Sequence, residues 1–153
     1  MSPDQVTTFK FKYPCDRLLP IQGVVPEDDL AHPKMRDANG DPCILLIKNG
    51  RTTNTTIGRG TGIQSFVRDY LPDGTEQTSM EFAILGYNKF AAFSEVGDSG
   101  AIIIDSEGRV VALLTGGSGQ AGSTDITYGT PFEWLLERIK AKFPDAYVYP
   151  TTD

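Results

Sequence analysis

From residue 43 onward the chain consists of short apolar or β-branched segments, each followed by residues that favour turns. Segments of three to eight residues at this spacing are typical of an antiparallel barrel or sandwich, where tight turns return each strand along its neighbour. The sixteen glycines and ten prolines favour the same architecture over a helical bundle. Six or seven strands are expected, at residues 44–48, 52–57, 63–70, 80–85, 101–105, 109–115 and 126–128.

The connections between these strands carry their own signals. Asn49-Gly50 is a strong two-residue hairpin signal. Turns are also expected at 71–74 (Leu-Pro-Asp-Gly) and 106–108 (Ser-Glu-Gly), where residues that favour turns occur.

One helix is expected at the end of the barrel. The apolar residues that repeat at helical spacing are Phe132, Leu135, Leu136, Ile139 and Phe143. A capping box with Thr130 as N-cap and Pro131 at the first helical position would start this helix, and Pro144 would end it.

The first 42 residues differ from the rest because they hold six of the ten prolines. Proline donates no backbone hydrogen bond, so this spacing leaves little room for a paired strand or a helix. We expect an irregular N-terminal arm at 1–42 with at most one or two short strands, and a barrel plus terminal helix at 43–153.

Composition excludes several classes of partner. The net charge is −6 and the basic residues do not cluster, which argues against nucleic acid and against anionic membrane surfaces. No segment has the roughly 18 apolar residues that cross a bilayer, and the N-terminus lacks the pattern of a secretory signal. A cytoplasmic location with free thiols at Cys15 and Cys43 is therefore expected. One histidine and two cysteines without zinc spacing imply no metal or cofactor.

Gly97-Asp98-Ser99-Gly100 is the motif that carries chemistry. A serine hydroxyl becomes a nucleophile only when a rigid turn presents it beside a base and two N–H groups that stabilise an oxyanion. Glycines around a serine permit such a turn. The alternative is an ordinary solvated turn, since all of these residue types favour turns.

The surrounding sequence resembles the second barrel of chymotrypsin-like (trypsin-like, PA clan) serine proteases. The segment 95–104 is similar to their nucleophile segment, and 114–119 is similar to the substrate-binding strand of the streptogrisin branch. The segments 48–55 and 127–132 resemble the opening hairpin and the strand behind the specificity pocket. The resemblance covers about residues 44–143, with the order of the segments preserved. The sequence of this region is also similar to trypsin-like proteins encoded in fungal genomes.

The resemblance implies a six-stranded chymotrypsin-like barrel with a C-terminal α-helix, acting on an extended peptide or protein substrate. Ser99 would be the nucleophile, the N–H groups of Gly97 and Ser99 would form the oxyanion hole, and Asp98 would stabilise the turn. The substrate would lie along Thr115, Gly116 and Gly117. Phe93, six residues before the nucleophile, would select a neutral or apolar side chain.

The histidine and aspartate of such an enzyme lie on a first barrel, which 42 proline-rich residues cannot build. His32 is the single histidine, and its neighbours do not resemble the family's histidine motif. It is either a general base oriented by Asp37 or Asp41, or a loop histidine without catalytic part.

Three functions stay open at this point. The chain is the C-terminal half of a serine endopeptidase, inactive without its histidine-bearing barrel, or a pseudoprotease that binds extended peptides. The third alternative is a module that associates with itself through the face that a first barrel would otherwise cover.

Overall fold

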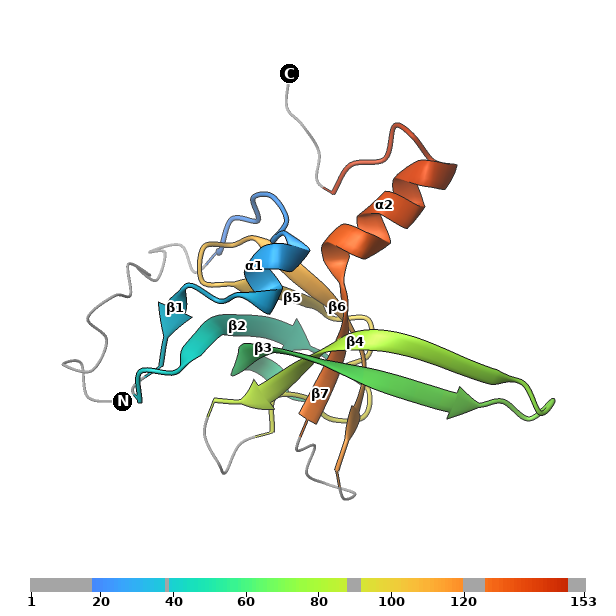
Figure 1. The fold of residues 1–153 in the computed structure, drawn as a ribbon. Coiled ribbons are helices and arrows are strands. Elements are labelled where there is room, and N and C mark those ends of the chain that lie inside the picture. The colour runs from blue at the N-terminus through green and yellow to red at the C-terminus, as the bar shows by residue number, and fades with distance from the viewer. Residues whose placement is uncertain (1–17, 38, 88–91, 120–125, 149–153) are drawn as a thin grey trace.

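The computed structural model describes residues 18–37, 39–87, 92–119 and 126–148, and Cys15 lies outside these ranges. Seven antiparallel strands follow the order β1-β2-β3-β4-β7-β6-β5, and β5 pairs back onto β2, so that six strands close into a ring (Figure 1). The strands are β1 (Met35–Arg36), β2 (Pro42–Gly50), β3 (Asn54–Tyr70), β4 (Glu76–Gly86), β5 (Ile102–Asp105), β6 (Val110–Ser118) and β7 (Ile126–Pro131). The predicted all-β barrel with a C-terminal helix is confirmed.

The core of the ring is built from alternate residues of its strands. In β2, Ile44, Leu46 and Lys48 are all buried, as expected where successive side chains point to opposite faces. They meet a core of large apolar side chains, which includes Leu30, Phe82, Ile84, Phe93, Ile103 and Leu114. Gly60 lets the Phe82 ring lie directly against β3, because a Cβ atom at this position would come within 2.6 Å of Phe82 Cε1.

The hairpin formed by β3 and β4 is much longer than the sequence suggested. We predicted separate strands at 52–57 and 63–70, but β3 is a single strand with an irregularity in its pairing between Gly60 and Gln64. Such an irregularity bends a strand without ending it. Beyond it the hairpin projects from the barrel and turns at 71–74, as predicted (Figure 1).

The predicted Asn49-Gly50 turn is wrong. Both residues belong to β2 and pair with Thr55 and Asn54, so that the chain turns at 51–53 instead. The reason is tertiary: two amides of this turn, those of Thr52 and Thr53, donate hydrogen bonds to a buried carboxylate elsewhere in the fold.

The segment before β2 is more ordered than its prolines suggested. It contains α1 (Glu27–Ala31) as well as β1, so the expectation that prolines leave little room for a helix is wrong. Pro26 precedes the helix and Pro33 follows it, positions where proline costs no helical hydrogen bond. Val25 and Leu30 are almost fully buried in the core of the barrel.

The terminal helix α2 (Phe132–Lys142) exists as predicted, but it begins differently. Pro131 is the N-cap, and no side chain caps the helix. The Thr130 hydroxyl donates to Glu81 at 2.9 Å, while the Glu133 carboxylate accepts the Glu27 amide at 2.7 Å. Thr130 and Glu133, the first and last residues of the predicted capping box Thr130-Pro131-Phe132-Glu133, thus make tertiary contacts instead. Neither α1 nor α2, the helices found in the described ranges, has the length and apolar character to span a membrane.

Candidate active site

Asp98 is the anchor of the turn that carries Ser99. Its side chain is fully buried, and hydrogen bonds reach it from three elements of the chain. Oδ1 accepts the amides of Thr52 at 2.7 Å and Thr53 at 3.2 Å. Oδ2 accepts the Thr53 hydroxyl at 2.6 Å, the Glu95 amide at 3.2 Å and the Lys48 ammonium at 3.1 Å. The carboxylate therefore ties the 51–53 turn and the 95–98 loop together.

Lys48 is the functional residue that sequence reasoning missed. Its side chain has no exposed surface, and its ammonium also donates to the Thr53 hydroxyl and to the Asn54 carbonyl. It lies 5.8 Å from the centre of the Phe93 ring. The signal was present: Lys48 continues the inward register of Ile44 and Leu46, and a lysine in that register requires a buried counter-charge.

The ionisation of Asp98 follows from this environment. Burial raises the pKa of the carboxyl, but the hydrogen bonds from the Thr53 hydroxyl, the Thr52 amide and the Lys48 ammonium outweigh it. Together they hold the pKa well below its usual range. Asp98 is therefore a charged structural group that keeps no proton to give or take at neutral pH.

The two glycines of the motif allow the sharp turn. Gly97 has φ of 103° and Gly100 has φ of 87°, a region that other residues rarely enter. A side chain at Gly97 would also meet the Thr52 hydroxyl at 2.5 Å. With its neighbour Asp98 buried, Ser99 is exposed, and its hydroxyl donates weakly to the Thr115 carbonyl at 3.5 Å.

The amides of this turn separate into two groups. Those of Asp98, Gly100 and Ala101 donate to backbone carbonyls at 3.1, 2.8 and 3.0 Å. The described part of the chain offers no acceptor to the amides of Gly97 and Ser99. Two amides without acceptors beside an exposed hydroxyl are the donors that an oxyanion hole needs.

The predicted substrate strand lies next to this turn. Thr115, Gly116 and Gly117 belong to β6, and Gly116 and Gly117 pair with β7 on one side. The pairing of β6 with β5 ends at Leu113. Within the described ranges, the opposite edge of this part of β6 therefore has no strand beside it, which is the arrangement that accepts an extended peptide.

A second residue that the sequence did not reveal is Glu81. Its side chain is buried on β4, and Oε2 lies 2.9 Å from the Thr130 hydroxyl and 3.4 Å from that of Thr115. The Thr115 hydroxyl is also 3.2 Å from the Tyr128 carbonyl. These contacts hold the side chain of Thr115, the residue whose carbonyl oxygen lies 3.5 Å from the Ser99 hydroxyl.

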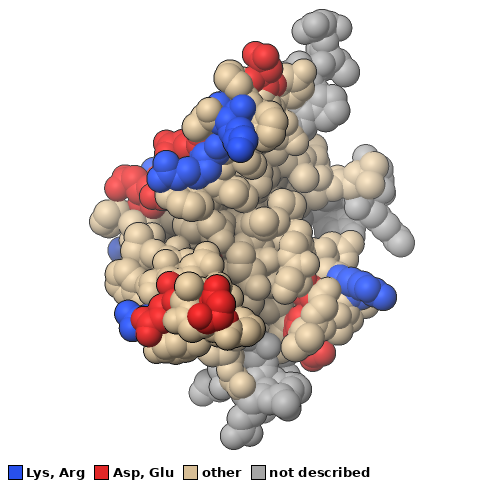
Figure 2. Space-filling view, turned by 90° about the vertical axis from the view of Figure 1, so that its right-hand side faces the viewer, with Lys and Arg blue, Asp and Glu red and all other residues tan. Residues whose placement is uncertain are grey.

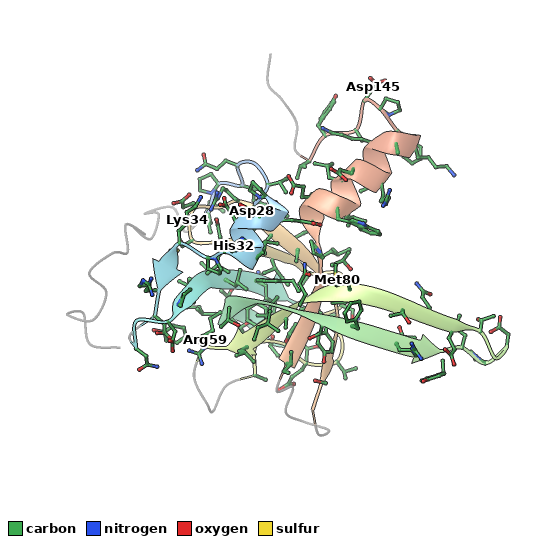
Figure 3. All side chains as sticks on the ribbon, in the orientation of Figure 1. Asp28, His32, Lys34, Arg59, Met80 and Asp145 are labelled. Carbon is green, nitrogen blue, oxygen red and sulfur yellow. The ribbon has the colours of Figure 1, made fainter. Side chains whose placement is uncertain are left out.

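Two other predicted residues lie away from the Ser99 hydroxyl. Phe93 is 1% exposed and packs in the core against Gly58. The side chain of His32 is 77% exposed beside α1, and its Nδ1 lies 3.2 Å from Asp28 Oδ1 (Figure 3). Asp37, which we considered as its orienting acid, instead pairs with Arg59. The His32 imidazole contacts the carbonyl and the carboxylate of Asp28, and neither contact connects it to Ser99.

Comparisons with known proteins support the fold. A scan against protein-family models found no match, and a search of curated proteins found none. The active form of the Rv3671c protease from M. tuberculosis aligns with a TM-score of 0.51 and 18% identity, over 87% of this chain and 52% of that chain. The inactive form of a serine-to-alanine mutant of Rv3671c aligns at 0.48 and 16%, over 85% and 57%. The chain spans about half the length of these structures. The likeness to the active form shows a shared fold.

Replacing Lys48 with Met should lower the free energy of unfolding, because it breaks the buried ion pair with Asp98. The Asp98 charge would stay buried without its cation, a change that typically costs about 3–5 kcal/mol of unfolding free energy. Urea unfolding measures this, with Lys34→Met as the control, because Lys34 forms an exposed pair whose loss costs at most about 1 kcal/mol. Adding Asp98→Asn to Lys48→Met should recover part of the loss; equal losses for the two lysines would contradict the assignment.

The ionisation of Asp98 should also appear in the acid limb of stability. Its pKa is lower in the folded state than the unfolded value of about 3.9. This stabilisation is complete above the unfolded pKa and is lost as the pH falls toward the folded pKa. The unfolding free energy of Asp98→Asn should therefore decline less steeply than that of wild type between about pH 5 and pH 2. Parallel curves from urea unfolding at each pH would show that Asp98 is not the group responsible.

Proposed function

We propose that the chain is the nucleophile-bearing half of a chymotrypsin-like serine endopeptidase, with Ser99 as nucleophile and the Gly97 and Ser99 amides as oxyanion hole. The observation that carries this proposal is the turn itself: Ser99 is exposed, the described residues offer no acceptor to the Gly97 and Ser99 amides, and a buried carboxylate holds the loop. Burying the charges of Lys48 and Asp98 costs desolvation free energy, and an ordinary solvated turn does not require such a buried ion pair. The protease-like fold supports the same reading.

The chemistry would proceed by acyl transfer. The Ser99 oxygen would attack a peptide carbonyl, whose oxygen becomes negative and accepts hydrogen bonds from the two amides. The serine proton needs a general base, and the leaving amine needs an acid. The described contacts of His32, the single histidine, are to Asp28, which supports a base supplied from outside this chain. The proposal therefore includes a very low hydrolytic rate for the chain alone.

Substrate would bind as an added strand along Thr115–Gly117, where β6 offers a free edge. This binding needs no catalytic base, so the same edge also supports the second candidate, a pseudoprotease that holds extended peptides. The selection of a neutral or apolar side chain by Phe93 stays a prediction from the resemblance, since the Phe93 ring is buried in the core of the barrel. The similarity of segment 114–119 to the streptogrisin branch is consistent with this mode of binding.

The amide pair can be tested without any catalysis. An acetylated tetrapeptide that ends in a free phenylalanine carboxylate resembles a cleavage product, and its carboxylate should sit at the Gly97 and Ser99 amides. We expect the peptide with the free carboxylate to bind at least about tenfold more tightly than the same peptide with a C-terminal amide. Charge-assisted hydrogen bonds contribute about 1.5–3 kcal/mol. In ¹⁵N-labelled protein, those two amide resonances should shift most. Equal affinities, or shifts confined to other residues, would refute the oxyanion hole.

The absence of a base should be visible in the reactivity of the serine. A fluorophosphonate probe labels serines that a base has activated. We expect the labelling rate of wild type to equal that of Ser99→Ala, and peptide cleavage to be equal in the two proteins. Rapid labelling at Ser99 would show that a base reaches this hydroxyl, and the proposed inactivity would then be wrong.

A further inference from the structure

A surface cavity of about 260 Å³ lies between α1, the start of β2 and the turn that joins β5 to β6. Its apolar lining includes Met35 and Cys43, which are directly opposite each other in the pairing of β1 with β2, and the adjacent Ile44. Pockets for drug-sized ligands typically measure about 300–1,000 Å³. The cavity is therefore small for such a ligand and better suited to one large side chain.

The charged groups that line this cavity are already paired with one another. The Lys34 ammonium lies 2.6 Å from the Asp29 carboxylate, and the Arg109 guanidinium lies 2.7 Å from the Asp105 carboxylate. Arg109 is also 3.5 Å from Glu107. An ionic ligand would have to compete with these pairs, whereas an uncharged ring would leave them intact. The cavity therefore favours an uncharged and largely apolar occupant.

The first 17 residues, which lie outside the described ranges, contain a segment of this chemistry. In Phe9-Lys10-Phe11-Lys12-Tyr13, aromatic residues alternate strictly with lysines. Such alternation predicts a strand with one covered face and one face in solvent. Cys15 follows Tyr13 by two positions, so it belongs to the aromatic face of such a strand. This segment needs an apolar surface to cover and a sheet edge to pair with.

The described part of the chain begins next to the cavity. The Pro20 carbonyl lies so close to Gly108 that it leaves no room for a side chain there, and Glu107, the preceding residue, lines the cavity. Cys15 is five residues before Pro20, a span of at most about 17 Å when fully extended. The length of this connection therefore keeps Cys15 in the neighbourhood of the cavity.

A second apolar surface, around the hairpin of β3 and β4, lies on another side of the molecule. Figure 2 faces the end of this hairpin and shows a largely uncharged surface bounded by acidic and basic side chains. The described chain begins on the side of the barrel away from the projecting hairpin (Figure 1). The short connection to Pro20 therefore favours the cavity as the place where the N-terminal segment docks.

From these observations we propose that residues 9–15 dock as an extended strand beside β1, with the Tyr13 ring in the cavity and Cys15 next to Cys43. Within the described ranges β1 pairs with β2 alone, so its outer edge is open to a further strand. The added strand would cover Met35 with its aromatic face and leave its lysines in solvent.

This docking does not depend on the function of Ser99. The cavity is lined by residues that precede β6, whereas Ser99 lies beside Thr115, in the second half of that strand. The two sites can therefore be tested separately.

Disulfide trapping in the full chain tests the position of Cys15. Its thiolate attacks glutathione disulfide and releases one glutathione. The Cys43 thiolate then displaces the second glutathione and closes the Cys15–Cys43 bond, and the two thiol protons pass to the released glutathione thiolates. Intact mass spectrometry separates the cross-linked chain from the glutathione adduct. The ratio of cross-linked chain to adduct should be at least about tenfold higher in native buffer than in urea, where only the intervening loop connects the cysteines.

Matched variants separate docking from a short connection alone. The aromatic-face variant combines Phe9→Ser, Phe11→Ser and Tyr13→Ser, and it should lower the native ratio about tenfold, toward its value in urea. The solvent-face variant combines Lys10→Ser with Lys12→Ser and should leave the ratio unchanged. Neither variant replaces a residue of the barrel core, so both should stay folded.

Alkylation gives a second measurement that needs no cross-link. In a Cys15→Ser background Cys43 is the single thiol, and the docked segment should protect it from iodoacetamide. The aromatic-face substitutions should accelerate this reaction at least about tenfold, and the solvent-face substitutions should not. Equal ratios in buffer and urea, equal effects of the two variants, or an alkylation rate indifferent to both would overturn the proposal.

Discussion

The ion pair between Lys48 and Asp98 is the interaction on which the geometry of the candidate site depends. Both side chains are completely buried, so each charge is tolerable only while the other stays within hydrogen-bonding distance. Strand side chains alternate, so a slip of β2 by one residue would move Lys48 to the outer face and leave Asp98 without its cation. The pair therefore fixes the register of β2 and, through Asp98, the position of Ser99 relative to β6.

The same constraint explains which parts of the fold were predictable from sequence. Alternation and turn residues located the strands, and helical spacing located α2, because these signals are local. The 51–53 turn was not predictable in this way. Asn49-Gly50 has the stronger local preference for a hairpin turn, but the chain turns at 51–53, where the Thr52 amide donates a hydrogen bond to Asp98. Thr130 was likewise predicted to cap α2, but its hydroxyl donates a hydrogen bond to the buried Glu81. In both cases a carboxylate distant in sequence outweighed a preference worth about 1 kcal/mol.

For the site, the motif identified the turn but not its support. Gly97, Asp98, Ser99 and Gly100 were recognisable because the segments around them resemble the second barrel of a known protease family, whereas the four residue types alone also suit an ordinary turn. Lys48 was read as the end of a strand, although its place in the inward register of β2 already required a partner. The amides of Gly97 and Ser99 have no acceptor among the described residues, and this could not be inferred from residue types, because whether an amide has an acceptor depends on how the loop is folded.

A turn so firmly supported has a consequence for how the chain could work with a second domain. Oxyanion stabilisation is effective when its donors are fixed in advance and need no rearrangement during reaction. In the proposed site, the loop that carries the Gly97 and Ser99 amides is held by groups of this chain, namely Lys48, Asp98 and the 51–53 turn. A histidine-bearing barrel would therefore need to deliver only a base to Ser99.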